Sequence, residues 1–300
     1  FEPAMMLPGF PPGAEPVHGT GETRAMKKIF AAATAATAYF SAAAAYADQP
    51  HPWQWRFQEP ANGIMHQIIW FEKYTLWFII PITLLVLALL AYCIVKFRAS
   101  VNPTPSRTSH NTLIEVIWTV VPVAILVVIA IPSFKLLYYS DTIPQADLTV
   151  KVIGKQWYWT YEYPDNGNFT FDSLMLTDEE AAARGEPRLL GVDNRIVVPV
   201  GKNVVLDVTA ADVIHAFAMP AFGIKTDAVP GRINEVWFKA EKEGLYYGQC
   251  SELCGKDHAF MPIAVRVVSD QEFAAWVETA KKKFATNPGN TYASADAAAR

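Results

Sequence analysis

The sequence predicts a membrane-anchored all-β protein, in which a hairpin of two transmembrane helices precedes an antiparallel β-sandwich or barrel and a C-terminal helix. Two long uncharged runs predict the hairpin, and short β-rich runs separated by turn residues predict the β domain. Hydrophobic residues make up 52% and charged residues 18%, which is too apolar for a disordered chain and high for a fully soluble one. The formal net charge of −4 argues against nucleic acid as a partner, because phosphate binding needs a concentrated basic surface.

The first 47 residues are expected to lie outside the folded protein. Residues 1–25 carry five prolines and four glycines without hydrophobic periodicity, so we expect a disordered extension or a stretch upstream of a true start at Met26. Residues 26–47 have the three parts of a bacterial secretory signal peptide, with a short alanine-rich cytosolic helix as the alternative. These parts are a basic pair, an apolar run and a small-x-small cleavage pattern, at residues 27–28, 29–40 and 45–47.

Two uncharged runs are long enough to cross a membrane. The first has 22 residues after Lys73 and the second has 19 residues after Glu115, and about 20 apolar residues span the hydrocarbon core. We expect transmembrane helices over about residues 74–96 and 114–137, within a segment that spans residues 48–140. Tryptophans near the helix ends favour a lipid interface over the alternative of buried core helices; they are Trp70, Trp77 and Trp118.

The connection between the helices predicts their orientation. Residues 96–111 contain Lys96, Arg98 and Arg107 and no acid, which is typical of cytoplasmic loops. The mature N-terminus and everything after about residue 140 are then expected outside, in agreement with a signal peptide. We therefore expect a protein of the bacterial inner membrane whose N-terminus and β domain are periplasmic.

Residues 141–285 are expected to form the outer domain, followed by a flexible tail over residues 286–300. Thr177–Gly191 is expected to be an exposed excursion with one helical turn, and Phe273–Phe284 to be an amphipathic helix after a capping-box spacing that starts at Ser269. The period-two and β-rich runs are Leu148–Tyr163, Arg195–Val200, Val204–Val208, Glu235–Lys239, Leu245–Gln249 and Ile263–Val268.

The outer domain concentrates the acidity of the chain. Residues 141–280 hold 12 Lys and Arg against 21 Asp and Glu, a local net charge of −9. A solvated surface accounts for much of this charge. An asymmetry of this size also favours encounter with a basic soluble partner, in a salt-dependent way.

One loop is dense in metal-ligand residues. Within the twelve residues Cys250–Met261 there are two thiols, one imidazole and one thioether, and His215 adds a second imidazole from an earlier segment. Thiolate, thioether and imidazole together suit copper, and a single cysteine with two histidines would form a mononuclear site. Two cysteines four residues apart can instead bridge a pair of copper ions.

Each ion would then take one histidine and one weaker ligand. Met261 would serve one ion, and a backbone carbonyl within the Cys-x-x-x-Cys turn, that of Glu252, would serve the other. Two alternatives compete with copper: a disulfide between Cys250 and Cys254 in an exported protein, and a zinc site of two cysteines and two histidines. Methionine is a poor zinc ligand, and zinc ribbons usually place two residues between their cysteines.

Three motifs together resemble subunit II of haem-copper cytochrome c oxidases of the bacterial aa3-like type, over about residues 65–280. They are Gly248–Gly255 with His258 and Met261, Asp212–His215, and Gly154–Tyr163. The resemblance implies a cupredoxin-like β-sandwich with a binuclear copper centre, CuA. It also implies that electrons pass from cytochrome c through this centre to a haem in subunit I, where oxygen is reduced and protons are pumped. Subunit III is a further expected partner, as is membrane lipid.

The resemblance also implies roles for particular residues. Glu252 would bind copper through its carbonyl and a magnesium ion at the subunit I interface through its side chain. Trp157 would be the residue at which electrons enter, and strand alternation is expected to place it on the same face as Trp159. The copper ligands implied are His215, Cys250, Glu252, Cys254, His258 and Met261; the acids expected to dock cytochrome c are Glu162, Asp193 and Asp212.

Glu115 is a separate candidate. A carboxylate at the start of a membrane helix can be a charge stabilised by the helix dipole. Residues 110–118 nevertheless resemble the family segment whose glutamate opens a proton channel into subunit I, and the expected topology places Glu115 on the cytoplasmic side.

Other functions remain open at this stage. A stand-alone membrane-anchored copper carrier or delivery factor, and a nitric oxide reductase subunit with the same centre, would carry the same ligands. Quinol oxidase subunits of this family lack the copper ligands, so the intact set argues against them.

Overall fold

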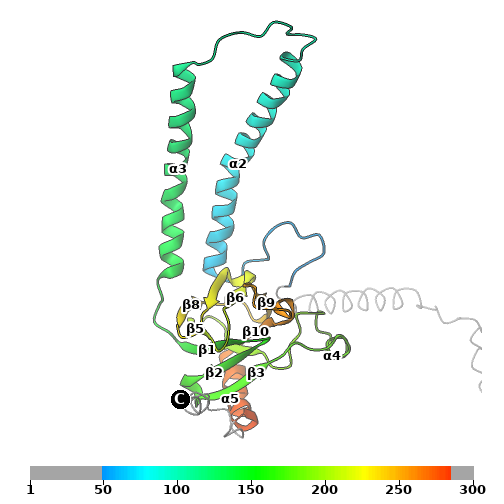
Figure 1. Cartoon of the computed structure of the whole chain (residues 1–300). Coiled ribbons are helices and arrows are strands. Elements are labelled where there is room, and N and C mark those ends of the chain that lie inside the picture. Colours follow the sequence, from blue (N-terminus) through cyan, green and yellow to red (C-terminus); the bar gives the residue numbers. More distant parts are fainter. Residues whose placement is uncertain (1–48, 285–300) are drawn as a thin grey trace, which may run out of the picture. The chain divides into compact units, whose positions relative to one another are not determined.

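The computed structural model describes residues 49–284, which form two long helices and a β-sandwich with a C-terminal helix (Figure 1). This is the fold class that the sequence predicts. The expected extension over residues 1–25, the signal peptide over residues 26–47 and the tail over residues 286–300 lie outside the described residues.

The first long helix, α2 (Gly63–Lys96), begins about ten residues earlier than its apolar run. The side chain of Asn62 caps it by accepting a hydrogen bond from the Met65 N–H at 2.8 Å. Ile64 and Met65 are buried against the β domain, and the Ala61 N–H donates to the Ala221 carbonyl at 2.9 Å. At 1.5 Å per residue, the helix exceeds the ~30 Å hydrocarbon core, so its first turns belong to the outer domain.

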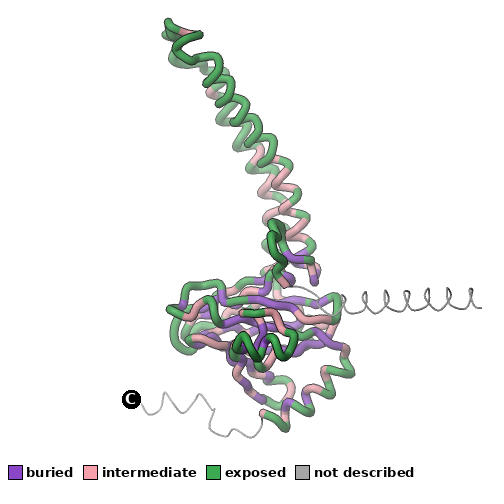
Figure 2. The backbone as a smooth tube through the Cα atoms, turned by 90° about the vertical axis from the view of Figure 1, so that its right-hand side faces the viewer, coloured by how far each residue is buried: buried purple, intermediate pink, exposed green. Residues whose placement is uncertain are grey.

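The second long helix, α3 (Thr112–Asp141), is capped by Asn111 and contains Pro122 and Pro132. The most apolar windows of both helices are 0% buried, and Figure 2 shows the hairpin as mostly exposed in contrast to the buried sandwich. The Tyr74 hydroxyl donates to the Val128 carbonyl at 3.2 Å, which ties the two helices together. Long apolar helices with exposed surfaces are those that lipid can cover.

Two five-stranded sheets form the sandwich, in the orders β3-β2-β1-β5-β8 and β4-β10-β9-β6-β7. Most neighbours are antiparallel, but β1 with β5 and β4 with β10 are parallel. The first sheet contains β1 (Leu148–Lys155), β2 (Tyr158–Tyr163), β3 (Phe169–Ser173), β5 (Val204–Ala210) and β8 (Asn234–Phe238). The second contains β4 (Ile196–Pro199), β6 (His215–Met219), β7 (Ile224–Ala228), β9 (Gly244–Cys250) and β10 (Pro262–Val268).

The core lies between the sheets and extends under the C-terminal helix α5 (Asp270–Phe284). Tyr163 joins the sheets, because its buried hydroxyl donates to the Val197 carbonyl at 2.9 Å and accepts from the Val197 N–H at 3.0 Å. Trp276 of α5 packs edge-on against Tyr163 and Phe169. The helix begins at Asp270, three residues before the expected Phe273, and it is capped at the expected Ser269, whose hydroxyl accepts from the Glu272 N–H.

The expected run Leu148–Tyr163 is a hairpin rather than one strand. β1 and β2 pair antiparallel with Lys155 opposite Tyr158, so Gln156 and Trp157 form the turn. The expectation that strand alternation places Trp157 beside Trp159 is therefore wrong: Trp159 is fully buried on β2, whereas Trp157 lies half-buried in the turn.

The excursion over residues 177–191 contains a full short helix, α4 (Asp178–Arg184), rather than one turn. A capping box between Thr177 and Glu180 stabilises its start, and Gly185 ends it in the left-handed conformation. Such caps let a short polar helix form without much buried surface.

Candidate metal centre

Three neighbouring segments bring the predicted copper ligands together. His215 is the first residue of β6, Cys250 is the last residue of β9, and Cys254 lies in the loop that follows. His258 begins the short 3-10 helix η3 (His258–Phe260), and Met261 directly precedes β10. Because β9 pairs with both β6 and β10, the strand ends that carry these residues lie side by side at one end of the second sheet.

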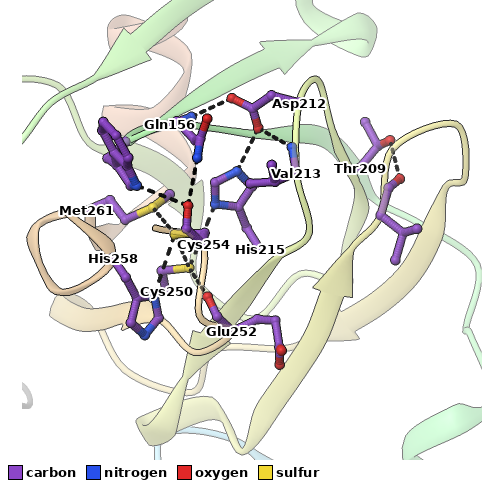
Figure 3. A network of polar contacts seen from close by, with 12 residues as sticks. Gln156, Thr209, Asp212, Val213, His215, Cys250, Glu252, Cys254, His258 and Met261 are labelled. Atoms are coloured by element: carbon purple, nitrogen blue, oxygen red, sulfur yellow. Dashed lines mark hydrogen bonds and ion pairs between the residues drawn. The ribbon is translucent and has the colours of Figure 1, made fainter. Parts of the chain in front are cut away.

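The sulfur of Cys250 is the centre of one group of ligand atoms. His215 Nδ1 lies 3.9 Å from it, and the Glu252 carbonyl oxygen lies 3.4 Å from it (Figure 3). The sulfur of Cys254 is also 3.9 Å away. The nearest metal-ligating atoms of His215, Cys250 and Cys254 all lie within 4.8 Å of one another.

The sulfur of Cys254 is the centre of a second group. His258 Nδ1 lies 3.5 Å from it and the thioether sulfur of Met261 lies 3.6 Å from it. Each thiol therefore has one imidazole and one weaker donor of its own, and the two thiols face each other. All six predicted ligands take part in this arrangement.

The ligand side chains of the site are mostly buried, and its two cysteines do not form a disulfide. Cys250, Cys254, His215 and Met261 are all buried, and both cysteines are free. Their 3.9 Å sulfur separation is well beyond a disulfide bond of about 2.05 Å. Thiolate, thioether and imidazole together suit copper, so this donor set fits a copper centre better than zinc, magnesium or calcium.

An acid three residues upstream holds the first histidine in place. Asp212 Oδ1 lies 2.9 Å from His215 Nε2, which leaves Nδ1 directed at the cysteine sulfur. The same carboxylate accepts the Val213 N–H and, through Oδ2, the Gln156 N–H, both at 2.6 Å. A carboxylate behind a metal-ligating histidine fixes the tautomer and orientation of its ring.

The β1–β2 turn contacts the other side of the site. The Trp157 indole N–H donates to the Cys254 carbonyl at 3.2 Å, and the Gln156 side-chain N–H donates to the same oxygen at 2.8 Å. Gly255 has φ +124°, and a Cβ there would lie 2.9 Å from the Trp157 ring. The ring thus packs directly on the backbone of a ligand residue.

One further aromatic residue, Trp159, and one glycine, Gly154, pack against the ring of His215. The buried Trp159 indole donates to the Met261 carbonyl at 3.2 Å and packs edge-on against the His215 ring. A Cβ at Gly154 would lie 2.8 Å from the His215 ring, so only glycine fits there. The sequence pattern alone did not indicate these contacts.

The ionisable groups of the site affect one another. Burial raises the pKa of Cys250, but contacts with His215 and with the backbone at Glu252 and Ala216 outweigh it and lower the pKa to about 6. Burial and the charge of Cys250 raise the pKa of Cys254 to about 12. Burial lowers the pKa of His215, but its contacts with Cys250 and Asp212 outweigh burial and raise it.

Glu252 points in two directions. Its carbonyl faces the Cys250 sulfur, whereas its side chain points away from that sulfur (Figure 3). The side chain is exposed and lines a wide recess shared with Asp207, Asp227 and Glu235. One residue can therefore contribute a backbone oxygen to the metal site and a carboxylate to an outward-facing surface.

The remaining predicted residues lie apart from the ligands. Glu162 faces Lys151 at 3.5 Å, and Asp193 accepts the N–H groups of Leu174 and Asn194 at 2.8 and 2.7 Å. Glu115 lies in the first turn of α3 and accepts the Asn111 N–H at 3.1 Å.

Two family models match the chain. The one described as cytochrome c oxidase subunit II, transmembrane domain, matches residues 50–136, and the one described as cytochrome c oxidase subunit II, periplasmic domain, matches residues 148–268. These matches cover the hairpin and the sandwich respectively.

Similar proteins carry the same description. A probable cytochrome c oxidase subunit 2 of Rickettsia bellii is 52% identical over 246 residues, 82% of this chain and 91% of that protein. Cytochrome c oxidase subunit 2 of Cereibacter sphaeroides is 43% identical over 274 residues, 83% of this chain and 90% of that protein. A crystal structure of the periplasmic domain of subunit II of the Bradyrhizobium japonicum cytochrome oxidase is 70% identical, covering 48% of this chain and 99% of that one, with a TM-score of 0.45.

The chain has a two-helix hairpin followed by a β-sandwich, and two thiols, two imidazoles and a thioether lie together at one end of the second sheet. These features define a membrane-anchored, cupredoxin-like protein with a ligand set that suits copper. The chain belongs to the cytochrome c oxidase subunit II family. It is therefore a subunit of an oxidoreductase complex, and this subunit has two membrane spans.

Proposed function

We propose that this chain accepts electrons from cytochrome c at a binuclear copper centre of the CuA type and passes them to a haem in subunit I. The observation that carries the proposal is the pairing of the thiols, since each has its own histidine and its own weak donor while facing the other. Cys250 and Cys254, together with the four other predicted ligands, would hold a pair of copper ions, which would supply a one-electron acceptor.

The chain's own residues keep that acceptor rigid. His215 is fixed by Asp212, and Cys254 is fixed through its carbonyl by Gln156 and Trp157. Burial of the sulfurs excludes water from them. A site whose ligands are held from outside needs little rearrangement when an electron arrives or leaves.

Trp157 is the proposed point at which electrons enter. Its half-buried ring reaches the surface, and its indole N–H contacts the backbone of Cys254 directly. A haem edge resting on this ring would be one hydrogen bond away from a ligand residue. Glu162, Asp193 and Asp212 are the proposed docking acids for a basic cytochrome c, within a domain whose net charge over residues 141–280 is −9.

The other assignments concern the assembled oxidase, with subunit I and subunit III as proposed partners. The Glu252 carboxylate would bind magnesium at the interface with subunit I, using the side chain that points away from the thiols. Glu115 would pass protons into a channel of subunit I. The basic loop over residues 96–111 supports placing that loop in the cytoplasm and the β-sandwich in the periplasm of a bacterial inner membrane.

Stopped-flow mixing of the copper-loaded full chain with reduced cytochrome c tests this function. The native chain should oxidise cytochrome c rapidly, and Trp157→Phe should slow the reaction by orders of magnitude while leaving the copper absorption spectrum unchanged. Trp53→Phe is the matched control, because Trp53 is 99% exposed and does not contact the ligands. Equal rates for Trp157→Phe and the native chain, or no oxidation by the native chain, would contradict the proposal.

A further inference from the structure

A second polar recess lies away from the ligand residues, between the C-terminal helix α5 and the segment that leads into β4. Its volume is about 350 Å³. No copper ligand lines it. Its cationic lining residues come from four different segments of the chain: Arg184 at the end of α4, Arg195 before β4, Arg266 on β10 and Lys283 in the last turn of α5.

This cationic lining is unusual for so acidic a domain. Asp193 is the one acid among the lining residues, and its Oδ1 already accepts two backbone N–H groups. Arg195 has an ion-pair partner, Glu186, whose side chain is 7% exposed. Even with both acids counted, the recess carries a net charge of about +2.

Two of the cations are available to a ligand. Among the described residues, neither Arg184 nor Arg266 has an acid within ion-pair distance, and both are exposed to solvent at the recess. Lys283 is held in place by a hydrogen bond from its ammonium group to the Asn194 side chain at 2.9 Å. The two arginines therefore present unpaired guanidinium groups beside a positioned ammonium group.

Bringing these charges together costs free energy that an anion would offset. Burial lowers the pKa of the Arg195 guanidinium; Tyr247 raises it, and the like charges of Arg266 and Arg184 lower it, so these two arginines lie close enough to repel Arg195. Trp276 and Phe284 form an apolar wall beside them, which reduces screening by water.

We propose that this recess binds a multivalent oxyanion of the phosphate type. The planar guanidinium groups match pairs of phosphate oxygens in a bidentate geometry, and a singly charged ion would not neutralise the site. The same chemistry is present in inorganic pyrophosphate and in the polyphosphate of a nucleotide. A bound anion would remove the positive patch and make the acidic domain more negative still.

Isothermal titration of pyrophosphate into the detergent-solubilised full chain tests the proposal. We expect one site per chain, with Arg184→Gln and Arg266→Gln each weakening binding by about tenfold, the scale of one charge-assisted contact. Arg188→Gln is the matched control, because Arg188 is exposed, pairs with Asp178 at 2.8 Å and does not line the recess. Arg195 is not substituted, since that change would leave the buried Glu186 carboxylate without its cation, with only the Tyr247 hydroxyl still donating to it.

A parallel titration with ATP distinguishes the two sources. Tighter binding of ATP than of pyrophosphate would assign the recess to a nucleotide, and equal binding would assign it to an inorganic anion. Absence of pyrophosphate binding at millimolar concentration would overturn the proposal. Equal weakening by Arg188→Gln would also overturn it, because binding would then follow overall charge rather than this recess.

Discussion

Asp212 holds the candidate metal site together through three contacts, with His215 Nε2, the Val213 N–H and the Gln156 N–H. The sequence predicts it only as one of several surface acids that dock a basic partner. Its side chain is 34% exposed, which allows docking as well. Its contacts with His215 and with the β1–β2 turn predict that the copper site depends on it directly.

Substitution of Asp212 should therefore change the copper site itself. Asp212→Ala should shift the visible spectrum and the reduction potential of the loaded chain, because the His215 ring loses the group that orients it. Asp212→Asn, which keeps one acceptor oxygen, should retain more of the native spectrum. Glu162→Gln is the control and should alter only the salt dependence of cytochrome c binding. If both Asp212 variants kept the native spectrum and reduction potential, Asp212 would have no role in the metal site and would remain only a docking acid.

Copper binding should weaken as pH falls. Near pH 7 the Cys250 thiol, with its pKa of about 6, is largely ionised, whereas Cys254, with a pKa of about 12, still holds its proton. Copper must displace that proton, so apparent affinity should drop about tenfold per pH unit, and more steeply below pH 6, where Cys250 also binds a proton. Chelator competition between pH 5 and 8 measures this slope. A flat profile would mean that the thiolates are not the ligands.

At the scale of the elements, the apolar pattern predicted the two membrane helices and most strands of the sandwich. It did not predict the features that depend on tertiary contacts. The two uncharged runs gave both helices, but α2 extends back to Gly63 because Asn62 caps it and Ile64 and Met65 pack on the sandwich. Short strands such as β7, whose exposure alternates and whose five residues include Lys225 and Asp227, carry too weak a pattern to recognise.

At the start of α3, the side chain of Glu115 has a capping role beside its proposed role in proton uptake. Glu115 accepts the Asn111 N–H, while the Asn111 side chain accepts the Ile114 N–H at 3.2 Å. Both contacts satisfy N–H groups near the helix start. The capping role and the proposed proton uptake by Glu115 are therefore separable by experiment.

Glu115→Ala should lower steady-state turnover of the assembled oxidase while copper loading and cytochrome c binding stay intact. The reason is that alanine removes a proton acceptor at the expected cytoplasmic end of α3, across the bilayer from the sandwich. Asn111→Ala is the matched control, since it removes the cap but keeps the carboxylate. Turnover measured against pH decides between the roles: an equal loss in both variants would leave Glu115 as a capping residue.

At the scale of the whole molecule, six ligands could be predicted from the sequence because five of them lie within twelve residues and the donor chemistry is distinctive. The residues that hold these ligands in place could not be predicted from the sequence in the same way. Gln156 and Trp157 reach the Cys254 carbonyl across 98 and 97 positions of the chain. The pairing of β1 with β2 forms the turn, and the parallel pairing of β1 with β5 sets Gly154 opposite Ala210, near Asp212. The pairing of β6 with β9 brings His215 to the ligand loop.

The central claim is that two thiolates hold two copper ions as one redox unit. Quantifying copper in the purified full chain, with electron paramagnetic resonance on the same sample, tests it most directly. The predicted result is two coppers per chain and a hyperfine pattern from one unpaired electron shared equally between two copper nuclei. One copper per chain with a single-nucleus pattern, or a Cys250–Cys254 disulfide that persists after copper loading, would contradict the claim.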